Sequence, residues 1–278
     1  MKFTTQAQAK KVTGLSYLGG VATSSKISHS REFSHQHTYA VYLAPANVSG
    51  YNVCSHSTPE CRLGCLNTSG RAGIEEFAGL DKIKKARIAK TKLFFENQDF
   101  YMDWLIAEIR AKQAKAKREG FYFSVRLNAT SDIDWQNVKH YGMTIFEIFP
   151  EISFYDYTKN ASKFDNIAPN YHLTLSYTGR NWDKCLDVLS KGHNVAMVFN
   201  VKDVADLPAM YKGYKVINGD LTDYRIDDAK GIIVGLKWKR IANRVNEAKV
   251  LNSCFVVNPT DNIDCSGLNV QTLKVALS

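Results

Sequence analysis

Three cysteines within twelve residues are the side chains of this sequence best suited to chemistry. Cys54, Cys61 and Cys65 have the spacing Cys-x6-Cys-x3-Cys, and they follow an apolar run at 39–44 that predicts a β-strand. Thiolates are the usual ligands of iron–sulfur clusters and of structural zinc. A loop this rich in cysteine and in turn-forming residues therefore indicates a metal centre more than a packed core.

The cysteine spacing favours an iron–sulfur cluster over zinc. Zinc sites usually draw four ligands from two short knuckles, and only Cys61 and Cys65 form such a knuckle here. Three thiolates can instead hold three irons of a [4Fe–4S] cluster and leave the fourth open for a cofactor, a substrate or a distant cysteine. Cys265 is the expected fourth ligand, with His56 and Cys254 as alternatives. Zinc is the second hypothesis.

The placement of the loop resembles that of radical S-adenosylmethionine enzymes. Those enzymes carry Cys-x3-Cys-x2-Cys on the loop after the first strand of a partial barrel. The likeness implies S-adenosylmethionine as a cofactor beside the cluster, and a radical-type or redox enzyme. The spacing here differs from theirs, and the chain has no clear counterpart of the Gly-Gly-Glu run that binds the methionine amine. Whether the chain is an enzyme is left open.

The rest of the sequence predicts the scaffold that positions the loop. Short apolar runs alternate with helices or long connections, which is typical of βα units in a parallel sheet, and no Gly-x-Gly-x-x-Gly fingerprint favours an open doubly wound sheet. We predict an α/β fold: a single-domain, partial or closed β/α barrel with mainly parallel strands. The expected strands are 39–44, 121–127, 144–149, 152–155, 172–175, 195–199, 215–217 and 231–236, with helices from the Asn97–Asp99 region to Gly120 and at 182–191.

One barrel domain is expected over residues 39–250, with the cysteine loop at 54–65. Residues 1–38 are rich in Ser, Thr, Lys and Gly and are expected to be irregular or short edge structure. Residues 251–278 are expected to form a tail that packs near the cysteine loop. A single α/β barrel domain of 278 residues is of ordinary size.

Polar residues at the carboxyl ends of the predicted strands are expected to form one pocket. Ligands of a β/α barrel bind where these ends meet, and the cysteine loop lies at the same end. The expected substrate or cofactor residues are Asn128, Asp132, Asp156, Lys159, Arg180, Asn200, Asp220 and Lys237. The acidic stretch 218–228 could also hold a divalent cation, although an acidic turn with a local Arg–Asp pair is the better explanation of this stretch alone.

The charge of the chain suggests two alternative functions. The net charge is +9, with basic clusters at 82–87, 110–118 and 237–240, which indicates affinity for phosphate-bearing partners or simply solvated helix faces. A zinc-stabilised nucleic-acid-binding protein could use these clusters. A metal-dependent hydrolase could use the strand-end carboxylates Asp132, Asp156 and Asp220.

No membrane partner is expected. No run approaches the roughly 18 to 20 apolar residues of a membrane span. The amino-terminal residues lack the apolar segment of a secretory signal. We therefore expect a cytoplasmic protein in which the six cysteines are thiols or metal ligands more than disulfides.

Several motifs of the chain together resemble a bacteriophage family known as gene product eighty-eight. They are the cysteine run at 54–71, Val125–Asn128 with Ser131-Asp132-Ile133, Phe154–Lys159, Asn218-Gly-Asp220 with Asp223 and Arg225, and Gly235-Leu-Lys237. The resemblance covers residues 39–265 and implies a phage-encoded protein of the infected bacterial cytoplasm, with a site built from these motifs. It does not imply a reaction.

Overall fold

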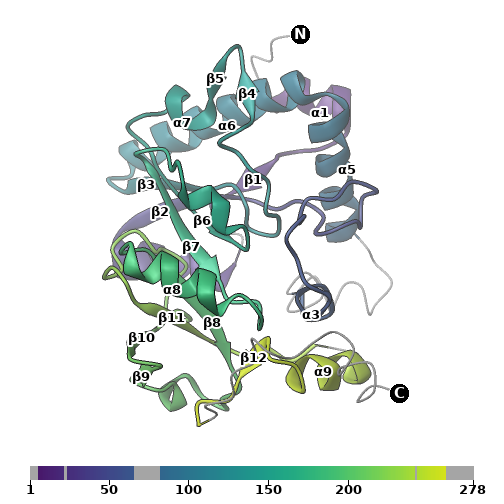
Figure 1. Cartoon of the computed structure of the whole chain (residues 1–278). Helices are drawn as coiled ribbons and strands as arrows, with labels where there is room; N and C mark the ends of the chain where they lie inside the picture. The colour runs from purple at the N-terminus through teal and green to yellow at the C-terminus, as the bar shows by residue number, and fades with distance from the viewer. Residues whose placement is uncertain (1–5, 22–23, 66–81, 242, 261–278) are drawn as a thin grey trace.

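The computed structural model describes residues 6–21, 24–65, 82–241 and 243–260, which form an α/β fold around a 10-stranded, mostly parallel sheet. The strands are β1 (Gly19–Gly20), β2 (Gln36–Val41), β3 (Tyr122–Arg126), β6 (Ser153–Thr158), β7 (Tyr171–Ser176), β8 (Asn194–Phe199), β9 (Met210–Tyr211), β10 (Tyr214–Asn218), β11 (Ile233–Lys237) and β12 (Val256–Val257); β4 (Lys139–His140) and β5 (Met143–Thr144) form a separate hairpin (Figure 1).

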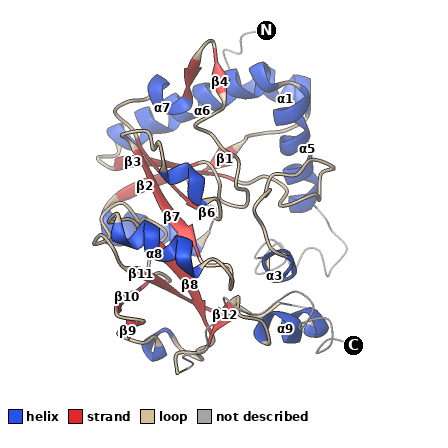
Figure 2. Ribbon diagram, in the orientation of Figure 1, coloured by secondary structure: helices blue, strands red, loops and turns tan. Residues whose placement is uncertain are grey.

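Helices cover the sheet and its edges (Figure 2). They are α1 (Gln6–Thr13), α2 (Ser25–Ser34), α3 (Pro59–Leu63), α5 (Lys82–Glu96), α6 (Gln98–Arg118), α7 (Ile145–Ile148), α8 (Trp182–Ser190) and α9 (Arg244–Leu251), with 3₁₀ turns at Ala161–Phe164 and Val204–Asp206. The long helix α6 packs on β2 and β3, and α8 packs on β8. As the sequence predicts, the Asn97 side chain caps α6 by accepting from the Phe100 N–H, and Trp104, Leu105 and Ile109 bury its inner face.

The sheet is not closed into a barrel. Its order is β1-β2-β3-β6-β7-β8-β11-β10-β9, and the two-residue strands β1 and β9 pair antiparallel at opposite edges. The parallel strands follow chain order from β2 to β8, as a barrel would require, but β11 then lies between β8 and β10. The mainly parallel α/β character is thus confirmed, whereas the predicted barrel is not, because short antiparallel strands occupy both edges of the described sheet.

Strand β12 enters the sheet where β7 and β8 separate. The amino half of β8 pairs with β7 through Ala196, whereas its carboxyl half, Val198 and Phe199, pairs with β12. β11 pairs with β8 along its whole length on the other side. A segment from near the end of the described chain therefore completes the carboxyl end of the central strand.

The two faces of the sheet differ in polarity. Alternate residues of a strand point to opposite faces, and on β3 Val125 belongs to the hydrophobic core beneath α6. Its neighbours Ser124 and Arg126 point to the other face, where Ser124 hydrogen-bonds to Thr38 and Arg126 donates to Asp223. This second face is covered by α2 and the segment 219–228, which follows β10 and is held to α2 by the Lys26–Asp220 ion pair of 2.6 Å.

One local prediction is wrong and another is incomplete. The described part of residues 1–38 contains the short edge strand β1, as expected, but also the helices α1 and α2, and the Ser24 side chain caps α2 by accepting from the Ile27 N–H. The strand expected at 144–149 is the short helix α7. Thr144 and Glu147 form a capping box there, which satisfies backbone N–H groups of a helix start.

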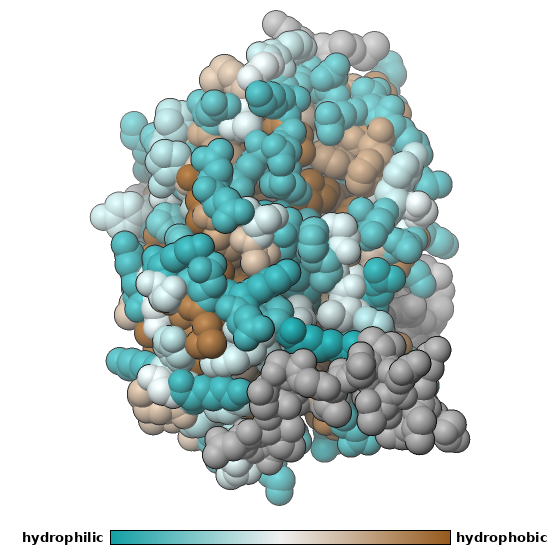
Figure 3. Space-filling model, viewed as in Figure 1, coloured by the Kyte–Doolittle hydropathy of each residue, from teal (hydrophilic) through white to brown (hydrophobic). Residues whose placement is uncertain are grey.

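The described residues on the face drawn in Figure 3 are mostly hydrophilic, with hydrophobic residues in scattered patches. No helix in the described part of the chain is long and apolar enough to cross a bilayer.

Candidate functional site

The cysteine loop leaves the carboxyl end of β2 and is fixed to the loop that follows β3. The Ala129 N–H donates to the Val41 carbonyl, and the Asp132 N–H donates to the Val53 carbonyl at 2.8 Å. The Thr130 hydroxyl donates to the Leu43 carbonyl at 2.6 Å. These hydrogen bonds hold the loop after β2 against the loop after β3. Cys54 directly follows Val53, the last of these bonded residues.

Cys61 lies on the one-turn helix α3, whose ends are set by local sequence. The Thr58 side chain accepts from the Cys61 N–H, and Pro59 occupies the first helical turn, where its missing N–H costs nothing. Gly64 ends the helix against Trp238, and a Cβ at Gly64 would lie 3.0 Å from the indole ring. Trp238 directly follows β11. The loop that leaves β2 therefore runs past the carboxyl ends of the intervening strands as far as the end of β11 (Figure 1).

An apolar cluster packs beneath α3. Trp238, Ile241, Val250, Phe255 and Val256 form its buried part, and Cys61 and Leu63 pack against it. It joins α9 and β12 to the cysteine helix, and α9 contacts α3 directly. The cluster shields one side of the cysteine loop from water.

None of the three cysteines of the loop is in a disulfide, and all three are half-buried. Burial raises the pKa of Cys54 to about 11; the Ala46 N–H, 3.4 Å from its sulfur, opposes this rise, and the nearby Cys65 and Cys61 add to it. The Cys54 thiol is thus close enough to feel charge on both of the others. No group of three His, Cys, Asp or Glu side chains among the described residues is already arranged to hold a metal ion.

Lys159, at the carboxyl end of β6, places a cation against this loop. Its side chain hydrogen-bonds to Cys61. Burial alone would lower the pKa of Lys159, but Cys61 and Asp132 raise it above its ordinary value. Lys159 therefore stays charged beside the Cys61 sulfur.

Arg180 brings a second cation to the loop from the end of β7. Its Nη2 lies 2.9 Å from Oε1 of Glu60, in α3 between Pro59 and Cys61. The Arg180 side chain is about one-third exposed, whereas that of Glu60 is largely buried. The ends of β2, β6 and β7 thus meet at the cysteine helix.

Asp132 connects the loops at the carboxyl ends of β3 and β6. Its carboxylate accepts from the Thr158 hydroxyl at 2.7 Å, from the Lys159 N–H at 2.9 Å and from the ammonium of Lys163 at 2.6 Å. Lys163 is buried and also donates to the Ile133 carbonyl. With these bonds made, Asp132 holds the loops after β3 and β6 together next to the cysteines.

Asn128 and Asp156 are buried and bind partners within the fold. The side-chain oxygen Oδ1 of Asn128 accepts from Ser131, Ile133 and Trp135, so it organises the loop after β3. Asp156 accepts from the Asn128 N–H at 2.7 Å and from the Tyr171 hydroxyl at 2.9 Å. Burial raises the pKa of Asp156 to about 7, against the lowering effect of Arg126 and of these hydrogen bonds.

Three other predicted pocket residues lie in contacts of their own. Asn200 hydrogen-bonds to Asn258 at 3.0 Å. Asp220 pairs with Lys26, and its other oxygen accepts from the Lys237 N–H at 2.7 Å. The ammonium of Lys237 donates to the carbonyl of residue 202. No described contact joins these three side chains to the cysteine loop.

The candidate fourth metal ligands differ in where they lie and in what they bind. Cys265 lies outside the described residues. Cys254 is disulfide-bonded and offers no thiolate. His56 is exposed and its ring contacts Ser55 at 3.0 Å.

The chain combines an open, mainly parallel α/β sheet with a thiol-bearing loop at the carboxyl ends of its strands. It belongs to the family described as Gene product 88, whose model matches residues 3–252. This agrees with the family resemblance noted in the sequence motifs, and the family is one of bacteriophage proteins. No curated protein and no solved structure matches the chain.

Proposed function

We propose that the chain binds a [4Fe–4S] cluster through Cys54, Cys61 and Cys65. The observation that supports the proposal is the presence of three cysteines outside any disulfide on one loop at the carboxyl edge of a parallel sheet, with Cys54 close to both of the others. The hydrogen bond from Lys159 to Cys61 places a cation beside one of the three sulfurs.

The donor set and its surroundings fit such a cluster. Iron–sulfur clusters are bound by thiolates, and their properties depend on nearby hydrogen bonds and on exclusion of water. Lys159 supplies the hydrogen bond, and the apolar cluster around Trp238 covers one side of α3. The three sulfurs are not yet arranged to hold a metal ion. We therefore expect α3 and the segment around Cys54 to move toward each other when the cluster binds.

Three protein thiolates leave one iron of the cluster open. A cluster with an open iron supplies one-electron redox chemistry together with a position for a cofactor or substrate. S-adenosylmethionine is the cofactor that we propose, and the enzyme class would then be radical-type. The charged groups beside the loop, Lys159 and Arg180, are suited to orient a carboxylate or a phosphate of the bound molecule.

Anaerobic reconstitution with iron and sulfide tests the proposal. We expect a brown protein with about four iron and four sulfide per chain. The single variants Cys54→Ala, Cys61→Ala and Cys65→Ala should each lose most of the bound iron. Cys185→Ala is the matched control, because Cys185 is a buried free thiol on α8, far along the chain from the loop. A colourless protein, or equal iron loss in the control, would refute the cluster.

Zinc is the second candidate, favoured by the short Cys61-x3-Cys65 knuckle, neither cysteine of which is in a disulfide. Elemental analysis distinguishes the two metals: zinc at about one per chain without sulfide would replace the cluster in the proposal. A nucleic-acid function of the zinc form predicts binding that weakens steeply with salt.

The contacts of the strand-end carboxylates do not support the hydrolase alternative. Asp132, Asp156 and Asp220 each bind different partners, namely Lys163, Tyr171 and Lys26. Two carboxylates on one cation are what such chemistry needs.

A further inference from the structure

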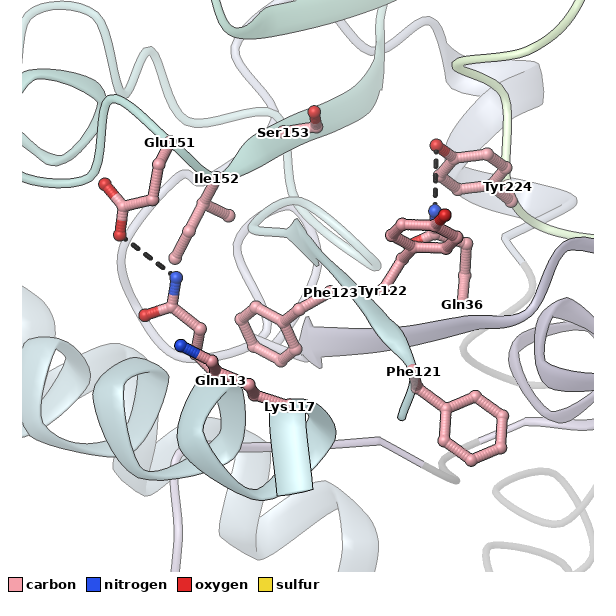
Figure 4. Close-up of a pocket in the computed structure, with 10 residues that line it drawn as sticks. All are labelled: Gln36, Gln113, Lys117, Phe121, Tyr122, Phe123, Glu151, Ile152, Ser153 and Tyr224. Carbon is pink, nitrogen blue, oxygen red and sulfur yellow. Dashed lines mark hydrogen bonds between the residues drawn. The ribbon is translucent and has the colours of Figure 1, made fainter. Parts of the chain in front are cut away.

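A pocket lies at the amino ends of β2, β3 and β6, opposite to the end that carries the cysteine loop (Figure 4). Its volume is about 300 Å³, at the lower end of the range for small-ligand sites. Gln36, Tyr122 and Ser153, the first residues of the three strands, line it together with side chains from the last turns of α6. The site proposed for the cluster contributes nothing to it.

The walls of the pocket combine aromatic rings with polar groups. Figure 4 shows the Phe123 ring between Gln113 and Lys117 on one side and Gln36 on the other. Tyr122 stands beside Gln36, and its side chain is 69% exposed. An exposed ring at the mouth of a pocket offers a flat surface for stacking.

Gln36 gives the pocket an unused hydrogen-bond acceptor. The residue is only 8% exposed, and its Nε2 donates to the Tyr224 hydroxyl at 3.2 Å. Its Oε1 has no hydrogen-bond partner within the described parts of the chain. A buried carbonyl oxygen without a partner costs free energy, which a ligand N–H in the pocket would recover.

Cations surround the aromatic residues at this end of the sheet. The guanidinium of Arg31 lies 4.7 Å above the Phe121 ring, next to Tyr122 in the chain. Lys117 lines the pocket, and Arg118 follows it on the exposed end of α6. A carboxylate is also present, but Glu151 accepts from Gln113 at 3.0 Å. Positive groups are thus available for a phosphate outside the pocket.

We propose that this pocket binds a nucleobase. A nucleobase is planar, it stacks on aromatic rings, and its N–H groups can donate to a carboxamide oxygen such as Gln36 Oε1. The attached phosphate would meet Lys117 and Arg31. The base comes either from a free nucleotide or from an unpaired position of a single strand, and the inference is independent of the proposed cluster.

Binding measurements with two kinds of probe test the proposal and separate the two sources. The full chain is titrated against fluorescein-labelled ten-residue single-stranded oligonucleotides of each base, followed by anisotropy, and unlabelled mononucleotides are added as competitors. Competition by mononucleotides identifies a nucleotide site. Binding of the oligonucleotide without such competition identifies a strand site. Absence of binding to either probe overturns the proposal.

Three substitutions make the test specific to the pocket. Tyr122→Ala should weaken binding by about five- to a hundredfold through the lost stacking, and Gln36→Leu should weaken it and flatten the preference among bases. Tyr141→Ala is the matched control, since Tyr141 is 72% exposed on the separate β4–β5 hairpin. Lys117→Ala, at an exposed position, provides a pocket variant whose folding is not at risk.

Two results would overturn the pocket assignment. One is equal binding by Tyr122→Ala, Lys117→Ala and Tyr141→Ala. The other is equal affinity for a duplex of the same sequence, because paired bases cannot enter the pocket and only the backbone charge would then be recognised.

Discussion

Arg180 and Glu60 are 120 residues apart in the sequence, yet their side chains form an ion pair of 2.9 Å. The pair fastens α3, with Cys61 at its centre, to the end of β7. Exposed ion pairs contribute little to global stability, about 0–1 kcal/mol. Its effect should therefore be local, on the position of the cysteine helix.

We expect Arg180→Ala to release α3 without unfolding the protein. The free energy of unfolding should change by less than about 1 kcal/mol, while amide hydrogen exchange at 60–63 becomes faster and the iron content after reconstitution falls. Lys191→Ala is the matched control, because it removes an exposed ion pair with Asp187 on α8. Unchanged exchange at 60–63 would show that the pair does not hold the helix.

The Cys54 thiol should alkylate slowly at neutral pH in the metal-free protein. Burial raises its pKa to about 11, and only the thiolate reacts with iodoacetamide. The rate of modification, followed by mass spectrometry of the Cys54 peptide, should keep rising above pH 9. In urea the same peptide should follow an ordinary thiol pKa of about 8.5. Half-maximal reactivity near pH 8.5 in the folded chain would contradict the structure.

Lys159→Met should lower iron retention in the reconstituted protein without changing the fold. The substitution keeps the length of the side chain but removes the ammonium that hydrogen-bonds to Cys61. Lys202→Met, an exposed change on the loop after β8, is the control. If both variants keep iron equally through gel filtration, Lys159 does not support the thiolates.

Stability should fall with pH because of Asp156. Its pKa is about 7 in the folded chain and about 3.9 in the unfolded chain, so between these values the folded chain binds a proton that the unfolded chain has released. Stability from this group is present below about pH 4 and is lost as the pH rises through 7. Asp156→Asn should therefore gain stability relative to wild type across this window, by up to ~4 kcal/mol at pH 8. Urea unfolding of both proteins at pH 5 and pH 8 measures the difference. The same change in stability between the two pH values for wild type and for Asp156→Asn would contradict the prediction.

Removing one partner of the buried pair of Arg126 and Asp223 should lower stability strongly. Replacing both residues with apolar ones should lower it much less. The Arg126 Nη1 lies 2.6 Å from Oδ2 of Asp223, and both side chains are largely buried. Asp223→Ala leaves a buried guanidinium unpaired and should cost about 3–5 kcal/mol. The double variant Arg126→Met with Asp223→Leu should recover most of that loss. If the double variant is as unstable as Asp223→Ala, the loss does not come from an unpaired buried charge. The packing of these side chains would then hold the segment 219–228 to the sheet.

Much of the sheet could be predicted from apolar runs alone. The expected strand 172–175 lies inside β7, 195–199 lies inside β8, and the expected helix 182–191 is α8. These segments carry their own periodicity and turn residues, so local sequence decides them. The order of β10 and β11 could not be predicted, because either short apolar run can occupy the place beside β8.

The candidate site was predictable only in part, for a similar reason. Strand ends that share an edge brought Asp132, Lys159 and Arg180 to the loop of Cys61, as the carboxyl-end rule predicts. Glu60 was missed because its partner is far away in the sequence. Asn128 was expected in the pocket, but a polar residue after a strand can bind either a ligand or its own loop, and in the structure its carboxamide hydrogen-bonds to Ile133 and Trp135 of its own loop.

Strand β12 has a consequence for synthesis of the chain. Because residues 256–257 fill the gap that β7 leaves along β8, a nascent chain cannot complete its central strands until that stretch has left the ribosome. The sheet should therefore not be complete before residue 257 has been made, and truncations ahead of residue 256 should leave the carboxyl half of β8 unpaired on one side, an exposed strand edge that promotes aggregation.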